Sequence, residues 1–157
     1  MRMISWIFTR SYTEMHSNFI IQLAPGAEQV GLAVMLKDLI GQNLEQHPRK
    51  MADFNKLDIR IGLAVTDADI DLTLDFKADN AMTIYAGIEG KPELRIAAEA
   101  EIIIELSNQR IKWGLPYYFD ETGREIISAI KSGRLKIKGM ITHLPSLIRL
   151  SRVMSVH

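Results

Sequence analysis

The sequence predicts an α+β fold that combines about five strands with several helices. Its first third shows apolar residues at helical spacing. Between residues 57 and 106 the apolar residues instead alternate with polar ones, and helical spacing returns afterwards. A length of 157 residues is typical of one domain, large enough to bury roughly 70% of its unfolded surface.

The N-terminal residues carry a stripe of large apolar side chains that predicts a helix over residues 3–23. The stripe consists of Ile4, Phe8, Tyr12, Met15 and Phe19. Pro25-Gly26 then breaks the chain. We therefore expect residues 1–24 to form an N-terminal helical extension and residues 25–157 to form the main domain. The helix could pack on its own domain, join two copies in a homodimer, or lie on a membrane surface.

Residues 28–46 have the spacing of a second helix, which Pro48 ends, and Met51–Lys56 reads as a connector. Alternation then predicts strands over residues 57–65, 70–76 and 82–86, separated by turn signals at Thr66-Asp67-Ala68 and Asp79-Asn80. Three strands in succession predict an antiparallel meander with one solvated face.

Leu94–Leu106 alternates over its whole length and predicts a longer fourth strand, although its alanine and glutamate content keeps a helix open. Ser107 could cap a short helix running to Trp113. Thr122 and Glu125 have the spacing of a capping box at the start of a helix that Gly133 ends.

Leu135–Gly139 predicts the fifth strand, and Pro145 lies in the first turn of a final helix. One face of that helix is apolar, and Arg149 and Arg152 fall outside it. The face consists of Leu144, Leu147, Ile148, Ser151 and Met154.

The overall charge argues against a nucleic-acid partner, because basic and acidic residues are equal at 19 each. Charge is nevertheless segregated: residues 58–105 hold 4 basic and 11 acidic residues, and residues 109–157 hold 9 basic and 3 acidic. The basic region could make transient contact with an anionic membrane surface. We favour internal pairing, in which the basic last strand lies beside an acidic one.

Cysteine is absent, which suits the cytoplasm and excludes disulfides and thiolate chemistry. No apolar run is long enough to span a bilayer. The short apolar stretch Ile4–Phe8 is followed at once by Arg10 and Glu14, so it makes a poor signal peptide.

Searches for a metal, cofactor or catalytic site give no constellation. Asp67-x-Asp69-x-Asp71 begins like a calcium loop but has Leu72 and Ala78 where glycine and glutamate are required. Gly87-x-x-Gly90-Lys91 lacks the spacing of a phosphate loop. The four histidines are scattered, and no nucleophile elbow exists. We expect no catalytic residue, no metal and no cofactor.

The chain offers instead a surplus of apolar surface. Trp113, Tyr117, Tyr118 and Phe119 cluster in a segment broken by glycine and proline. Such aromatic groups can form the mouth of an apolar pocket, or they can belong to the core.

The segment Ile126–Gly139, IISAIKSGRLKIKG, together with the helix after it, resembles the end of the sterol carrier protein domain, the nonspecific lipid-transfer fold. The same order of elements can be laid along residues 28–156. The resemblance implies a mixed sheet whose fourth strand pairs with the first, with helices on one face. It also implies a tunnel for a lipid between sheet and helices, and no catalytic residues in the domain.

The function that this resemblance implies for residues 25–157 is non-catalytic binding or transfer of a lipid-like ligand, such as a fatty acid, acyl-CoA, sterol or isoprenoid. The expected ligand-binding residues are Trp113, Tyr117, Phe119, Ile127, Ile130, Leu144, Leu147, Ile148 and Met154. The expected headgroup contacts are Lys136, Lys138, Arg149 and Arg152. A protein–protein or dimerisation module beside a lipid-pathway enzyme is the alternative, and a small hydrolase or isomerase is a third reading.

Overall fold

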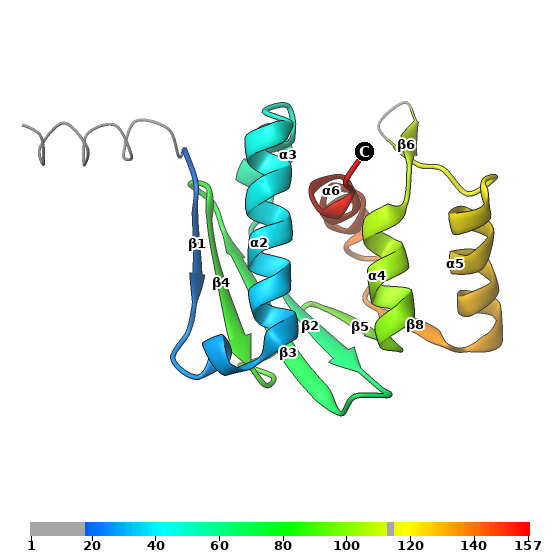
Figure 1. The fold of residues 1–157 in the computed structure, drawn as a ribbon, viewed down its shortest axis with the longest axis horizontal. Helices are drawn as coiled ribbons and strands as arrows, with labels where there is room; N and C mark the ends of the chain where they lie inside the picture. The colour runs from blue at the N-terminus through cyan, green and yellow to red at the C-terminus, as the bar shows by residue number, and fades with distance from the viewer. Residues whose placement is uncertain (1–17, 113–114) are drawn as a thin grey trace, which may run out of the picture.

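A computed structural model describes residues 18–112 and 115–157. In this part of the chain the main feature is a sheet of six strands in the order β1-β4-β3-β2-β5-β8 (Figure 1). The strands are β1 (Ile20–Leu23), β2 (Ile59–Val65), β3 (Ile70–Lys77), β4 (Ala81–Ala86), β5 (Leu94–Ala98) and β8 (Leu135–Lys138). The α+β class is confirmed, and this sheet has six strands where the sequence predicted about five.

Strands β2, β3 and β4 form the predicted antiparallel meander. Leu63 lies opposite Leu72, and Leu74 lies opposite Ile84, so the apolar residues of the three strands share one face. The hairpin between β3 and β4 turns through Asp79 and Asn80, whose φ angles are 75° and 59°. Aspartate and asparagine tolerate this left-handed conformation better than most residues, which is why the turn signal was readable in the sequence.

The sheet becomes mixed at β5, which pairs with β2 in parallel, and β8 then adds antiparallel to β5. The fourth predicted strand therefore pairs with the first, as the sterol-carrier resemblance implied. After β8 the chain turns at Gly139, whose φ is +85° and whose added Cβ would lie 2.4 Å from the carbonyl oxygen of Glu93. Glycine is thus required at the point where the chain leaves the sheet for its last helix.

The helix predicted over residues 3–23 is wrong at its C-terminal end. Ile20–Leu23 form the edge strand β1, which runs parallel to β4, and the Ile20 amide donates to the carbonyl of Asn80 at 2.9 Å. The stripe residues Ile4 to Met15 lie outside the described residues. Phe19 is described, and its ring meets that of Phe54 edge-on with centroids 6.3 Å apart.

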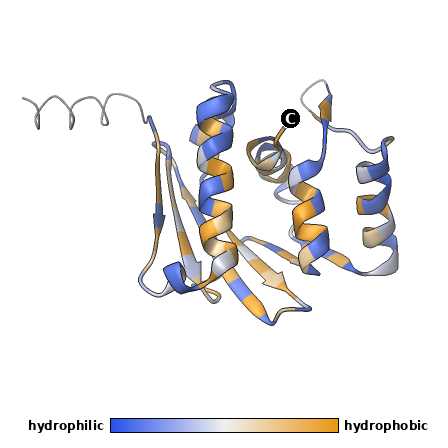
Figure 2. Ribbon diagram, in the orientation of Figure 1, coloured by the Kyte–Doolittle hydropathy of each residue, from blue (hydrophilic) through white to orange (hydrophobic). Residues whose placement is uncertain are grey.

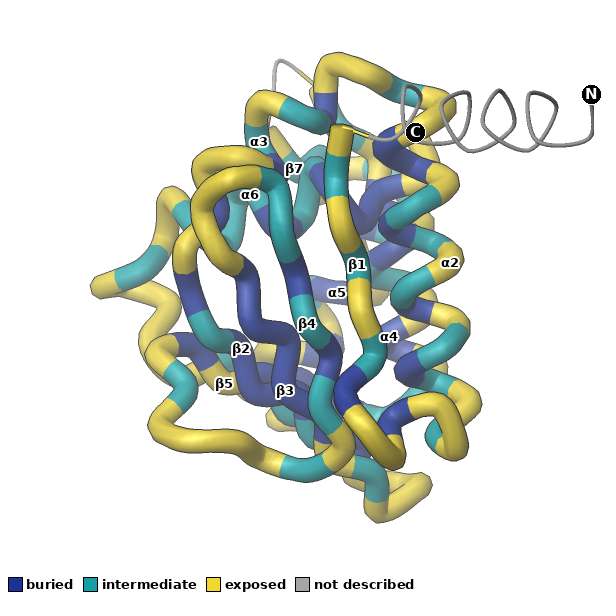
Figure 3. The backbone as a smooth tube through the Cα atoms, turned by 90° about the vertical axis from the view of Figure 1, so that its left-hand side faces the viewer, coloured by how far each residue is buried: buried dark blue, intermediate teal, exposed yellow. Residues whose placement is uncertain are grey.

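Helices cover one face of this sheet, and Figure 3 shows the other face free of helices. The helices are η1 (Ala27–Gln29), α2 (Gly31–Gln46), α3 (Lys50–Lys56), α4 (Ala100–Asn108), α5 (Glu121–Ser132) and α6 (Leu144–Met154). Figure 2 shows hydrophobic and hydrophilic residues alternating along the strands and in bands along α2. The buried core lies between the two layers, centred on residues such as Ile61, Leu74 and Ile40.

Two predicted elements are corrected in the first half of the domain. Residues 51–56, expected as a connector, belong to the short helix α3 (Lys50–Lys56), which buries Phe54. The long strand expected over Leu94–Leu106 is instead the strand β5 followed by helix α4. The Ala100 amide at the start of α4 donates to the carboxylate of Asp67 at 2.9 Å. The helix therefore begins with a cap supplied from the β2–β3 turn.

The segment after α4 also differs from expectation. Ser107 lies in the last turn of α4 instead of starting a helix, and a small hairpin follows with strands β6 (Ile111–Lys112) and β7 (Leu115–Pro116). Helix α5 is capped by Asp120, whose carboxylate accepts from the Gly123 amide at 2.7 Å, and not by the predicted box at Thr122. The predicted stop at Gly133 is confirmed by its φ of +79°.

No helix among the described residues is long and apolar enough to cross a bilayer.

Candidate functional site

A cavity of about 420 Å³ lies between the sheet and helices α4, α5 and α6. Strands β2, β3, β5 and β8 provide one wall, because the apolar residues of each strand point to the helical side. The side chains on that wall are Ile61, Leu63, Leu74, Ile96, Leu135 and Ile137. A volume of this size is typical of small-molecule sites.

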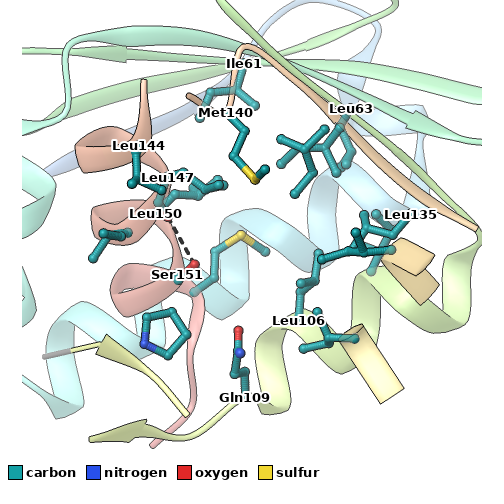
Figure 4. Close-up of a pocket in the computed structure, with 18 of the residues that line it drawn as sticks. Ile61, Leu63, Leu106, Gln109, Leu135, Met140, Leu144, Leu147, Leu150 and Ser151 are labelled. Carbon is teal, nitrogen blue, oxygen red and sulfur yellow. Dashed lines mark hydrogen bonds between the residues drawn. The ribbon is translucent and has the colours of Figure 1, made fainter. Parts of the chain in front are cut away.

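Helix α6 forms the opposite wall with one continuous face. All five residues of the face predicted from the sequence line the cavity, and Leu150 joins them. Figure 4 shows Leu144, Leu147 and Leu150 along one helix of this wall. The helix begins at Leu144 and has Pro145 in its first turn. Its two arginines are not part of the cavity lining, as the helical period of the apolar residues predicts.

Helices α4 and α5 close the remaining sides. Ile103 and Leu106 come from α4, and Ile126 and Ile130 come from α5. Several lining residues at the edge of the cavity are exposed: Leu115 at 53%, Ile130 at 44%, Leu144 at 46%, Met140 at 39% and Tyr118 at 39%. They form an apolar rim, while Ile61, Leu74 and Ile103 lie fully inside.

Among the described residues the cavity lining contains no ionisable acid or base other than the phenol of Tyr118. Its other polar side chains are Gln109 and Ser151. The Ser151 hydroxyl donates to the Leu147 carbonyl at 3.0 Å within its own helix. Gln109 is 2% exposed, and its side-chain nitrogen has no hydrogen-bond partner within the part of the chain that the structure describes.

Groups of acidic and histidine side chains that could hold a metal ion are absent from the described residues.

Comparison with known families decides what kind of domain this is. Residues 36–149 match the SCP-2 sterol transfer family, which is more than half of the chain. The chain belongs to the SCP-2 sterol transfer family. Membership supports lipid binding or transfer in general, and it confirms the resemblance read from residues 126–139.

Two solved structures are similar to this chain at low sequence identity. A structure described as UbiJ-SCP2, a ubiquinone synthesis protein, aligns with a TM-score of 0.56 and 16% identity, covering 82% of this chain and 98% of that one. A crystal structure of sterol carrier protein 2 aligns with a TM-score of 0.46 and 15% identity, covering 74% of this chain and 88% of that one. A search of curated protein sequences found no match.

The SCP-2 cavity brings together five of the nine residues expected to bind ligand. These are Ile130, Leu144, Leu147, Ile148 and Met154. Ile127 was expected on the same face as Ile130, but it lies beside a separate surface depression with Arg124 and Lys131. The cavity-facing pair of α5 is Ile126 and Ile130, which are four residues apart.

The aromatic cluster is divided by the structure. Tyr118 lines the cavity, but Phe119 is 81% exposed and packs on Tyr117 with ring centroids 5.7 Å apart. The Lys112 ammonium lies 4.1 Å from the centre of the Tyr117 ring. Trp113 lies outside the described residues.

The four expected headgroup residues lie in different surroundings. Lys136 and Lys138 are exposed on β8 and alternate with the cavity-lining Leu135 and Ile137, so they point to the opposite face of the sheet. Arg149 is half-buried on α6. Arg152 pairs with Asp53 of α3 at 2.9 Å.

The sequence favoured a basic last strand paired with an acidic neighbour, but among the described strands β8 does not have an acidic neighbour in the sheet. Lys138 lies opposite Arg95, and Lys136 lies opposite Ala97. The basic last strand therefore neighbours a strand that is itself basic at this register. The acidic β3 strand instead pairs with β2, where Arg60 bonds to Asp75 at 3.1 Å and the pKa of the Arg60 guanidinium is raised by that hydrogen bond.

The sequence predicted the strand residues of the cavity wall only as the apolar faces of strands. Ile61, Leu63, Leu74 and Ile96 were expected on the apolar face of their strands, but that pattern does not distinguish a cavity wall from a filled core. Gln109 gave no signal, because it fell within the short helix expected from Ser107 to Trp113 and glutamine is usually at the surface.

Proposed function

We propose that this SCP-2 domain binds and carries a lipid-like ligand, without chemistry, in the cavity between its sheet and helices α4, α5 and α6. The observation that carries the proposal is the apolar lining of the 420 Å³ cavity, which opens at a rim of exposed apolar side chains. Fatty acids, acyl-CoA, sterols and isoprenoids are the candidate ligands. The solved ubiquinone synthesis protein with this fold makes an isoprenoid worth testing among them.

The energetics of such a site favour long apolar chains. Each methylene moved from water into an apolar wall contributes roughly 0.8 kcal/mol, so several methylenes give tight binding with few polar contacts. The walls formed by Leu63, Leu135 and Leu147 provide that environment. Flexible Met140 and Met154 line the same space and can adapt to chains of different shape.

The polar groups of the cavity support a carrier role over catalysis. A nucleophilic serine requires a base within hydrogen-bond reach, but the Ser151 hydroxyl donates to the Leu147 carbonyl. Tyr118 lies at the rim and is 39% exposed. Nothing in the described lining pairs an acid with a base.

The rim also supports loading from an anionic membrane surface. Ile141 is 91% exposed directly after the rim residue Met140, and Arg149 follows on α6. Exposed apolar groups suit contact with a lipid surface, and a basic residue on the helix that follows favours an anionic one. Under this proposal Arg149 is the candidate headgroup contact among the four basic residues expected from the sequence.

Extraction of the purified protein followed by mass spectrometry tests the proposal. Lipid co-purifying in a defined ratio to protein, and displaced by an added fluorescent fatty acid, is the expected result. A protein that carries no lipid and takes up no probe, but is dimeric, would instead favour the protein–protein module. A homodimer through residues 3–23 belongs to that alternative.

A further inference from the structure

The backbone around Gln109 is held firmly between α4 and the C-terminal residues. The hydroxyl of Ser155 donates to the Gln109 carbonyl at 2.6 Å. The Val156 amide donates to the Ser107 carbonyl at 3.0 Å. These two contacts, at Ser107 and Gln109, hold the backbone where the chain leaves α4.

The side chain of Gln109 points into the cavity. Gln109 lines it, and Figure 4 shows its side chain extending into the space between Leu106 and Ser151. The side chain is 2% exposed, yet its amide nitrogen has no hydrogen-bond partner among the described residues. A buried donor without a partner costs free energy, and such groups are rare in native proteins.

The surroundings of Gln109 determine what could satisfy it. Ser151, the nearby polar lining residue in Figure 4, donates its hydroxyl to the Leu147 carbonyl, and among the described residues its oxygen does not accept from the Gln109 amide. The remaining neighbours named in the lining, such as Leu106, Pro116 and Met154, are apolar. A ligand oxygen in the cavity can supply the acceptor that the described residues do not give the Gln109 amide.

We propose that Gln109 is the polar anchor of the cavity and binds an oxygen acceptor on the uncharged head of an inward-facing lipid. This inference rests on the proposed function and narrows its ligand class. An amide is neutral, and the described lining contains no cation. An ionised carboxylate or phosphate at Gln109 would be buried without a counter-charge, which is strongly unfavourable. A ketone or ester carbonyl accepts the hydrogen bond without that cost.

The test compares two ligands with the same chain length, 2-dodecanone and dodecane, on the wild type and on Gln109→Leu. Binding is measured by displacement of the neutral dye Nile red. We expect the ratio of ketone to alkane affinity to fall about tenfold in the variant, the size expected for one buried hydrogen bond. Affinity for dodecane should be equal or higher. Gln42→Leu, on the exposed surface of α2, should keep the wild-type ratio.

Dodecanoate tests the requirement for an uncharged head. Its ionised head stays at the rim under this proposal, so its affinity for Gln109→Leu at neutral pH should be equal to that for the wild type or higher, as for dodecane. An equal loss of dodecanoate and ketone binding in the variant would overturn the uncharged-head assignment.

The failure of this inference differs from the failure of the proposed function. An unchanged ketone-to-alkane ratio with tight binding of both ligands would reject Gln109 as the anchor and leave lipid binding intact. A wild type that binds none of the probes would reject both. If Gln109→Leu does not fold, the side-chain amide resonance of Gln109 in the wild type gives the answer: it should shift with 2-dodecanone and stay in place with dodecane, and no difference between the two would reject the anchor.

Discussion

The side-chain nitrogen of Asn43 lies 3.0 Å from the carbonyl oxygen of Met154 and thereby joins α2 to the last turn of α6. It also donates to the Val153 carbonyl at 3.0 Å. Both carbonyls lie where a helix runs out of its own donors. One buried asparagine, 3% exposed, therefore fixes the end of the helix that forms a wall of the cavity.

Replacing Asn43 by alanine should destabilise the protein by about 1–3 kcal/mol, because two buried carbonyls lose their donor. Urea unfolding measures the change. Asn55→Ala, on the exposed side of α3, is the matched control and should stay within about 0.5 kcal/mol of the wild type. Equal effects of the two substitutions would show that Asn43 does not hold α6.

Ile130→Trp separates a ligand cavity from a filled core. Ile130 lines the cavity and is 44% exposed, so an indole can enter the open space. We expect near-normal stability with loss of acyl-probe affinity. In a filled core the same change would cost about 1–3 kcal/mol in strain.

Ile127→Trp is the control on the same helix, since Ile127 lies beside a different surface depression. It should leave probe affinity unchanged. Denaturant melts and acyl-probe titrations of the same samples compare both variants. If both tryptophans weaken binding equally, the ligand does not occupy the cavity described here.

Gln109→Leu should raise the stability of the ligand-free protein by about 1 kcal/mol, because it removes an unsatisfied buried donor. Gln42→Leu on α2 controls for the gain of an apolar side chain. Urea midpoints of lipid-stripped samples give the comparison. A clear loss of stability in Gln109→Leu would mean that the amide already has a partner in the free protein.

Lys50 should make stability depend on pH in the alkaline range. Burial lowers the pKa of its ammonium below the usual 10.5, the nearby Arg49 adds to this, and Asp53 opposes it. The Lys50 ammonium donates to the Ser155 carbonyl. The pKa of Lys50 is therefore lower in the folded protein than in the unfolded chain, where it is near 10.5. At a pH between these two pKa values the unfolded chain binds more protons than the folded protein. The free energy of unfolding therefore rises with pH through this range.

Replacing Lys50 by methionine removes this contribution. The difference in free energy of unfolding between the wild type and Lys50→Met should therefore shift in favour of the wild type as the pH rises from neutral to about 10. Lys56→Met, exposed on α3, controls for the loss of one positive charge. Parallel urea melts of the three proteins at several pH values measure the slopes, and identical slopes for wild type and Lys50→Met would contradict the prediction.

Two truncations separate the roles of the N-terminal residues. Removing residues 1–24 takes away β1 and leaves the edge of β4 without its neighbour, so aggregation at micromolar concentration should increase. Removing residues 1–17 keeps β1. A change of oligomeric state in the shorter truncation, followed by light scattering, would support dimer contacts within residues 3–17, and an unchanged state would count against them.

Elements with a regular apolar pattern were readable from the sequence alone. The alternation of residues 57–86 predicted the meander of β2, β3 and β4, because side chains of period two must separate onto the two faces of a sheet. Spacing at helical period likewise predicted the face of α6 that now lines the cavity. Local sequence decides these features because the burial of one face depends on the residue pattern itself.

Tertiary structure decided where local patterns were ambiguous. Leu94–Leu106 alternates throughout, yet α4 begins at Ala100 because the carboxylate of Asp67, from another turn, accepts from its amide. Ile127 and Ile130 were both acceptable on one helical face, and packing of α5 turned Ile126 and Ile130 to the cavity instead. Gln109 became a candidate anchor only through contacts of its backbone with Ser155. These features depend on contacts between residues that are distant in sequence, so a local pattern of residues could not predict them.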